Sequence, residues 1–304
     1  GVRGWLRKST VGWAVLLLAG GAALWSSVAI FSAGTQTRLA VGSKDFTEQL
    51  IVGEIVAQVI ESRTGVSVRR RFDLGGNLAH EALVAGEIDA YVEYTGTGLT
   101  AILKEPPLSD AAQVYRRVKQ EYDSRFGLEW TEPLGFNNTF AILVRGEDAR
   151  RLKLKTITDA ARYAPQWRAG FGQDFMSRPD GYAGFARIYG LKFIELREMD
   201  LSLTYRALVE RQVDLIAGNS TDGLIARHDL VQLEDDRGYF PPYDAVPVAR
   251  REALERHPAM REALKTLAGA ISVAEMRQLN YRADGERRPV PELAREFLRK
   301  KGLL

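Results

Sequence analysis

Six short motifs join turn-forming residues to polar, cationic or aromatic side chains, and each adjoins a strand-like run. The motifs are GSKDFTEQ (42–49), EYTGTG (93–98), GFNNTF (135–140), SRPDG (177–181), GNSTDG (218–223) and FPPYDA (240–245). They carry charged or hydroxyl donors, which suit an anion, and aromatic rings, which suit an apolar or cationic group. The donors include Lys44, Thr97 and Arg178, and the rings include Tyr94, Phe140 and Tyr243. Strand ends line the crevice of a doubly wound sheet, so we expect these motifs to form a binding site there.

The sequence gives no support for catalysis. It contains no GxSxG motif, and LGGN at 74–77 lacks both the full GxGxxG pattern and a P-loop lysine. Glu87, Asp89 and Glu93 alternate along a strand-like run and could hold a metal or form a carboxylate pair, but we expect them to be paired with Arg or Lys. We therefore predict no enzyme activity, no catalytic residues, no cofactor and no metal.

Composition excludes several classes of protein. The chain has no cysteine, which rules out disulfides, thiolate zinc sites, cysteine nucleophiles and a lipid-modified cysteine. The 42 Lys and Arg nearly balance the 39 Asp and Glu, giving a net charge of +3 over 304 residues. The densest basic run, Arg69 to Arg71, is too short to indicate a nucleic-acid partner.

The first thirty-odd residues differ from the rest. Residues 11–31 carry no charge and follow Arg3, Arg7 and Lys8. The run is about as long as a bilayer core requires, and its small-x-small exit is poor, which favours a membrane anchor over a cleaved signal peptide. Residues 1–35 are therefore expected to be this segment plus a linker, with the remainder exported to the periplasm or the outer face of the cytoplasmic membrane. Because the chain starts with glycine, fusion of the natural protein to a membrane domain stays open.

The exported part begins with alternating strand and helix signals. A strand at 38–44 precedes a helix from Thr47, the expected N-cap, to a stop at Gly65. A strand at 66–74, a helix at 78–85 and a strand at 88–94 follow. This order predicts an α/β fold with a largely parallel sheet.

Similar alternation recurs in the second half of the chain. Strands are expected at 140–144, 167–172 and 213–218, with helices at 158–163 and 203–211, and helices again dominate from Arg251 to Leu304. PPYDAVPVAR (241–250) holds three prolines, which sit poorly in central strands, so we predict a connecting segment.

The simplest architecture has two α/β lobes. Lobe I comprises residues 36–137 and 244–304, and lobe II comprises residues 138–243. Two chain crossings between the lobes would leave a central cleft that closes by hinge motion, a preferred place for a ligand.

GSKxFTEQ, EYTGT and PPYDA, in this order, resemble the substrate-binding proteins of ABC uptake systems for glycine betaine, choline and related osmoprotectants. The likeness runs from about Leu39 to the C-terminus. It implies a type II periplasmic-binding-protein fold that traps a solute between its lobes and delivers it to a permease driven by an ATPase, without catalysis.

The resemblance also implies a site with two halves. An aromatic box holds the quaternary ammonium, which cannot donate a hydrogen bond, through cation–π attraction. The positions that match the box are Tyr94, Phe140, Asn219 and Tyr243. The positions that match the carboxylate-binding half are Lys44, Thr97, Arg178 and the backbone of Asn138.

Two box positions depart from the family pattern, which has tyrosine at both. Phe140 keeps an aromatic face, whereas Asn219 replaces one wall with a small amide, at a cost of about 1–2 kcal/mol of cation–π attraction. Lys44 and Arg178 favour a carboxylated ligand such as glycine betaine over choline. The room at Asn219 favours a larger zwitterion, such as carnitine, a proline betaine or ergothioneine. An envelope enzyme or sensor domain of the same fold is a third alternative. The turn 220–223 is expected to cap the helix after it.

Overall fold

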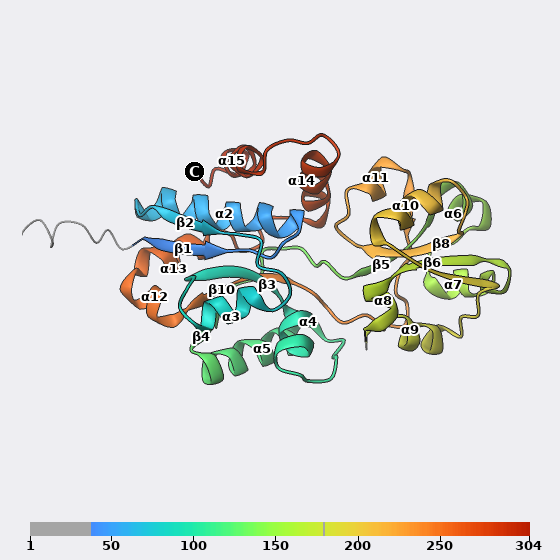
Figure 1. Ribbon diagram of the computed structural model, residues 1–304, viewed down its shortest axis with the longest axis horizontal. Helices are drawn as coiled ribbons and strands as arrows, with labels where there is room; N and C mark the ends of the chain where they lie inside the picture. Colours follow the sequence, from blue (N-terminus) through green and yellow to red (C-terminus); the bar gives the residue numbers. More distant parts are fainter. Residues whose placement is uncertain (1–37, 179) are drawn as a thin grey trace, which may run out of the picture. The chain divides into compact units, whose positions relative to one another are not determined.

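The computed structural model describes residues 38–178 and 180–304 (Figure 1). The expected anchor at 11–31 and the linker up to residue 35 lie outside the described residues. Within those two ranges, none of the helices combines the length and the apolar character needed to span a bilayer.

The first sheet has five strands in the order β2-β1-β3-β10-β4. Its strands are β1 (Leu39–Gly42), β2 (Val68–Arg71), β3 (Ala90–Tyr94), β4 (Leu128–Trp130) and β10 (Ala245–Arg250). β1 is parallel to β2 and β3, whereas β10 is antiparallel to β3 and β4. The three strands of the predicted β-α-β-α-β stretch are therefore parallel, as predicted, and the antiparallel β10 makes the sheet as a whole mixed.

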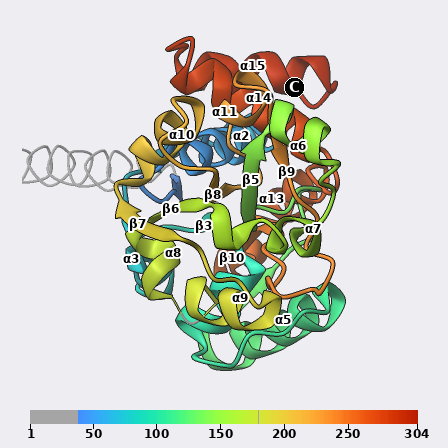
Figure 2. The same ribbon diagram turned by 90° about the vertical axis from the view of Figure 1, so that its right-hand side faces the viewer.

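Helices from both ends of the described chain cover the first sheet. The helices are α2 (Thr47–Thr64), α3 (Leu78–Val84), α4 (Thr95–Thr97), α5 (Ala111–Phe126), α12 (Arg251–Arg256), α13 (Pro258–Lys265), α14 (Val273–Asp284) and α15 (Val290–Lys300), with a π-helical turn at Gly98–Ile102. One hydrophobic core joins the sheet to α2, α13, α14 and α15, and a second joins it to α3 and α5. α14 and α15 lie beside α2 in both views (Figures 1 and 2). Residues 39–130 and 245–300 thus share one folded body.

The second sheet has the order β7-β6-β8-β5-β9. Its strands are β5 (Phe140–Arg145), β6 (Arg168–Gly172), β7 (Glu195–Met199), β8 (Leu215–Asn219) and β9 (Leu230–Gln232). β6 is parallel to β7 and β8, and β5 is antiparallel to β8 and β9. The accompanying helices are α6 (Gly146–Leu152), α7 (Ile157–Ala161), α8 (Gln173–Ser177), α9 (Tyr182–Tyr189), α10 (Leu201–Val209) and α11 (Leu224–Arg227), with a 3-10 turn at Ala164–Gln166. Separate cores lie on its two faces.

Two mixed sheets with separate cores confirm the predicted two-lobed α/β fold. The chain passes from β4 to β5 and returns from β9 to β10. These crossings are hydrogen-bonded to each other, since the backbone N–H of Asn138 donates to the Tyr243 carbonyl (3.0 Å) and that of Tyr243 donates to Asn137 Oδ1 (2.9 Å). The residue boundaries of the lobes stay a prediction.

The prediction of a connecting segment at 241–250 is wrong for its second half, because β10 lies inside the first sheet between β3 and β4. Pro247 is tolerated there because its missing N–H would face Thr131, just beyond the end of β4. The Pro247 carbonyl accepts the Thr131 backbone N–H (3.0 Å). The Thr131 carbonyl, to which Pro247 cannot donate a hydrogen bond, instead accepts one from the Tyr115 hydroxyl (2.6 Å).

Local signals at helix ends had mixed outcomes. Gly65 ends α2 in the left-handed conformation (φ 68°), as predicted. Thr47 is the first residue of α2 rather than its N-cap, and its hydroxyl donates to Asp284 (2.7 Å). The prediction that the turn 220–223 caps α11 is wrong, because the N-cap residue is Gly223, which has no side chain to cap the helix. The Asp222 carboxylate instead accepts the Asn219 backbone N–H (2.9 Å).

Candidate functional site

The predicted site residues lie where strands begin or end. Lys44 follows β1 and Tyr94 ends β3, and these two parallel strands deliver both residues to one edge of the first sheet. In the second sheet, Phe140 begins β5 and pairs in register with Asn219 at the end of β8. Tyr243 stands on the returning crossing, two residues before β10.

Lys44 is engaged by a carboxylate of the protein itself. Its Nζ lies 2.5 Å from Glu93 Oε1 and 5.7 Å from the centroid of the Tyr94 ring. Lys44 and Glu93 are both buried, and Glu93 also accepts the Tyr91 hydroxyl (3.0 Å) and the Tyr94 backbone N–H (2.8 Å). The expectation that Glu93 is paired with a basic residue is confirmed.

Glu48, on the first turn of α2, collects three donors from distant parts of the chain. Its carboxylate accepts the Tyr94 hydroxyl (2.6 Å) and the side-chain amides of Asn138 (2.9 Å) and Asn280 (3.0 Å). The Asn280 amide also donates to the Thr221 carbonyl (3.0 Å), next to the second sheet. Burial raises the pKa of Glu48 above its usual value, and the side-chain hydrogen bonds of Thr221, Tyr94 and Asn280 only partly oppose the shift. The network thus fixes Tyr94 and links α14 to the turn after β8.

Arg178, Asp180 and Tyr243 form a second cluster. The Arg178 guanidinium donates to both carboxylate oxygens of Asp180 (2.9 Å each) and to the Tyr243 hydroxyl (2.6 Å). The Tyr243 hydroxyl also donates to Asp180. The guanidinium carbon lies 5.5 Å from the centroid of the Phe140 ring and 5.8 Å from that of Tyr243. Two predicted box residues therefore already face a cation.

A pocket of about 540 Å³ lies beside Phe140 and Asn219. It is bounded by the carboxyl ends of β6, β7 and β8, and its lining residues are Phe140, Gly172, Gln173, Phe175, Glu198, Met199, Asp200, Ala217, Gly218 and Asn219. This is the edge at which ligands bind in open α/β sheets.

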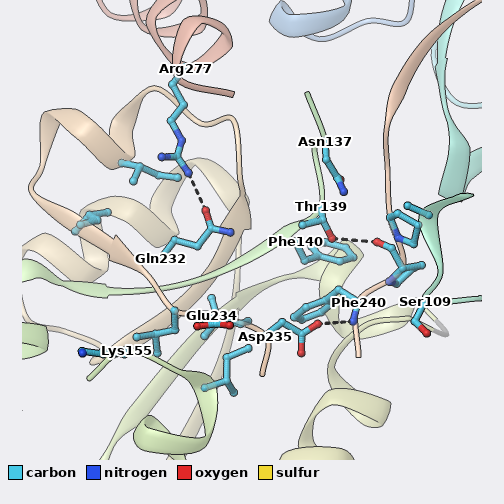
Figure 3. Close-up of a pocket in the computed structure, with 18 residues that line it drawn as sticks. Ser109, Asn137, Thr139, Phe140, Lys155, Gln232, Glu234, Asp235, Phe240 and Arg277 are labelled. Carbon is cyan, nitrogen blue, oxygen red and sulfur yellow. Dashed lines mark hydrogen bonds between the residues drawn. The ribbon is translucent and has the colours of Figure 1, made fainter. Parts of the chain in front are cut away.

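A larger pocket of about 760 Å³ shares only Phe140 with the predicted site. Figure 3 shows it between β5, β9 and the crossings, with Arg277 donating to Gln232 at one end and Lys155 near Glu234 at the other. The smaller pocket coincides with the strand ends and with both substituted box positions, but among the residues that the structure describes the other six predicted site residues are not part of its lining.

The structure brings most of the predicted residues into two groups. Phe140, Arg178 and Tyr243 meet in one, and Lys44 and Tyr94 meet in the other. Asn138 joins the groups, because its side chain reaches Glu48 while its backbone N–H is bonded to the Tyr243 carbonyl. Thr97 lies half-buried in α4, and within the described residues no side-chain hydrogen bond links it to the others.

Sequence reasoning missed the carboxylates that engage this set. Asp180 and Glu48 stand inside two of the six motifs. The signal would have been an acidic residue in a motif that also carries a predicted cation, Arg178 in one and Lys44 in the other. Asn280 had no signal, because it enters from a helix far away in sequence. Within residues 38–178 and 180–304, no cluster of three or more His, Asp or Glu could hold a metal ion.

The predicted ligand-binding side chains thus lie at strand ends of two α/β lobes. Residues 37–300 match the family described as the substrate binding domain of the ABC-type glycine betaine transport system, and the chain belongs to this family. The predicted resemblance is confirmed, and with it the type II periplasmic-binding-protein fold.

Individual relatives cover most of the chain. A glycine-betaine-binding protein of Pseudomonas aeruginosa is 38% identical over 288 residues, spanning 90% of this chain and 92% of the relative. A carnitine transport binding protein of Listeria monocytogenes is 36% identical over 263 residues, spanning 86% and 85%. A crystal structure of a glycine betaine/carnitine/choline ABC transporter superposes with a TM-score of 0.83 at 35% identity, covering 87% of this chain and 99% of that one. The protein is thus the extracytoplasmic substrate-binding component of an ABC transporter for betaine-type solutes, as predicted.

Proposed function

We propose that the protein captures a zwitterion with a quaternary ammonium and a carboxylate, such as glycine betaine, and delivers it chemically unchanged to its permease. One observation carries this proposal. The Phe140 and Tyr243 rings both face the guanidinium cation of Arg178, whose carbon lies 5.5 and 5.8 Å from their centroids. These separations lie within the range of about 6 Å over which an aromatic face attracts a cation. A trimethylammonium group requires such faces because it has no hydrogen to donate.

The carboxylate half of the proposal rests on Lys44 and Arg178. Both are charge-assisted donors close to the aromatic group, since Lys44 lies beside Tyr94 and Arg178 beside Phe140 and Tyr243. Thr97 and Asn138 complete the proposed set. Choline has no carboxylate for these donors, so they favour a betaine.

Replacing Arg178 with alanine is expected to weaken the binding of glycine betaine by about 10- to 100-fold. This fold-change corresponds to the loss of a charge-assisted hydrogen bond worth roughly 1.5–3 kcal/mol. Choline should lose much less. Isothermal titration calorimetry with both ligands measures the difference. Arg197→Ala is a matched control, because Arg197 makes the same two-bond contact with Glu195 on the exposed face of β7. An equal loss for both ligands would contradict a role for Arg178 in binding the carboxylate.

A second candidate keeps the mechanism but enlarges the ligand to carnitine, a proline betaine or ergothioneine. The half-buried Asn219 favours it, because a small amide lines the pocket of about 540 Å³ where the family pattern has an aromatic wall. A thermal-shift panel of these compounds, choline and glycine betaine ranks them. The largest shift at the lowest concentration for glycine betaine would exclude the larger ligand.

Asn219→Tyr should restore the missing wall. We expect glycine betaine to bind about tenfold more tightly, and a larger native ligand to bind more weakly because the space is filled. Titration of wild type and variant with both ligands tests this. Unchanged affinity for both would mean that residue 219 is not a wall of the site.

The proposal includes anchoring by residues 11–31 or export by a cleaved signal, and lobes bounded near 137/138 and 243/244. Mass spectrometry of the protein from fractionated cells distinguishes an intact N-terminal segment from a cleaved one. Nuclear magnetic resonance of the bound ligand over time tests the absence of catalysis, since any turnover would favour an enzyme.

A further inference from the structure

The edge of Arg178 that is suited to a ligand carboxylate already holds one. The Asp180 carboxylate accepts hydrogen bonds from Arg178 Nε and Nη2, each at 2.9 Å. This is the bidentate geometry in which arginine binds carboxylates most strongly. Nη2 is also the atom that donates to Tyr243 (2.6 Å). A ligand carboxylate that approaches this edge therefore meets a negative charge before it meets the guanidinium.

Asp180 is built into the site rather than attached to its rim. It is buried, with 4% of its surface exposed, and its carboxylate accepts the Tyr243 hydroxyl as well as the guanidinium. Burial alone would raise the pKa of Asp180, but the hydrogen bonds from Arg178 and Tyr243 outweigh burial and hold the pKa below its usual value. The side chain is therefore ionised at neutral pH, next to one member of the aromatic box.

We propose that Asp180 is a specificity-determining residue, an internal carboxylate that competes with the carboxylate of the ligand for Arg178. The inference rests on the proposed function, in which Arg178 binds that carboxylate. The competition acts in two directions. It weakens the binding of zwitterions, whose carboxylate must displace Asp180 from Arg178 or share Arg178 with it. It strengthens the binding of cations without a carboxylate, which gain a negative charge near the box.

The other half of the site has the same arrangement, which strengthens the inference. Lys44 is paired with the buried Glu93 at 2.5 Å, so each predicted carboxylate-binding cation has a carboxylate of its own. Asp180 differs from Glu93 in how it contacts the box. It accepts the side-chain hydroxyl of the box residue Tyr243 as well as the Arg178 guanidinium, whereas Glu93 contacts Tyr94 through its backbone N–H. The charge at position 180 is thus the one that can change selectivity between betaine and choline.

Asp180→Asn removes this charge and keeps the size of the side chain. We expect glycine betaine to bind more tightly and choline more weakly, so that the ratio of the choline Kd to the glycine betaine Kd rises about tenfold. Calorimetric titration of wild type and variant with each ligand measures the ratio. Glu195→Gln is the matched control, because Glu195 makes a two-bond contact with Arg197 at the same spacing in sequence, outside the site. The control ratio should equal that of wild type.

The outcomes separate the inference from the function on which it rests. If wild type binds neither ligand, nor any of the larger zwitterions, the proposed function fails. If wild type binds and Asp180→Asn weakens both ligands in parallel or leaves the ratio unchanged, Asp180 only positions its neighbours and the inference fails. Asp180→Ser, which removes the charge with a smaller side chain, replaces the asparagine variant if the latter loses its cooperative melting transition. Asp180→Glu keeps the charge and should keep a ratio close to that of wild type.

Discussion

Replacing Glu48 with alanine is expected to lower the free energy of unfolding by about 3 kcal/mol or more. The change leaves three buried or half-buried donors, from Tyr94, Asn138 and Asn280, without their acceptor. Each unsatisfied buried donor costs about 1–3 kcal/mol, although the costs are not additive. For a protein of this size the loss corresponds to roughly 6 °C in melting temperature. Glu262→Ala, at an exposed ion pair on α13, is the control and should change stability little.

The cost of Glu48→Ala should also depend on pH. Because burial raises the pKa of Glu48 in the folded protein, the ionised carboxylate is a penalty at neutral pH, and the nearby Asp222 charge adds to it. As the pH falls through the raised pKa towards the ordinary value of 4.5, the folded protein binds a proton that the unfolded chain does not. Wild type thus gains stability relative to the variant. Urea melts of both proteins at pH 7 and pH 5 should give a larger difference at pH 5, and a smaller one would disprove the assignment.

Replacing Tyr243 with alanine is expected to weaken the binding of a quaternary-ammonium ligand by about 30-fold or more. The change removes one aromatic face, worth about 2 kcal/mol for a desolvated cation, and also the hydroxyl that bonds Arg178 and Asp180. Calorimetric titration with glycine betaine and choline measures the loss. Both ligands should be affected, because both carry the trimethylammonium group.

Tyr243→Phe separates the two contributions. It keeps the ring and removes the hydroxyl, so choline should bind nearly as in wild type, while glycine betaine changes because Arg178 and Asp180 lose a shared partner. If the phenylalanine variant lost choline as completely as the alanine variant does, the ring of Tyr243 would not be a face of the box.

Sequence patterns predicted the fold well where local signals and tertiary structure agree. Gly65 ends α2 because the left-handed conformation there suits glycine. The prediction failed for β10 because proline cannot donate a ladder hydrogen bond and is therefore not expected in a central strand. Whether that bond is needed depends on Thr131 and Tyr115, which are distant in sequence from Pro247. Similarly, Thr47 has the side chain of an N-cap, but its hydroxyl is directed to Asp284 of the far C-terminal helix α14.

Positions in the site were easier to predict than their partners. Lys44, Tyr94, Arg178 and Tyr243 stand in motifs that can be read locally. Their counterparts Glu93 and Asp180 stand in the same motifs, yet sequence alone does not reveal which acidic side chain is buried against which cation. Asn280 lies beyond local reasoning, because only the packing of α14 on α2 brings it to Glu48.

The position of β10 has a consequence for the order in which the protein is assembled during synthesis. β10 separates β3 from β4, so β4 lacks its sheet partner, and β3 lacks one of its two, until residues 245–250 have left the ribosome. All strands of the second sheet lie between residues 140 and 232. Because domains fold as units during synthesis, the second sheet can be complete while the earlier half of the chain still exposes strand edges. The part of the protein that is translated first is therefore finished last.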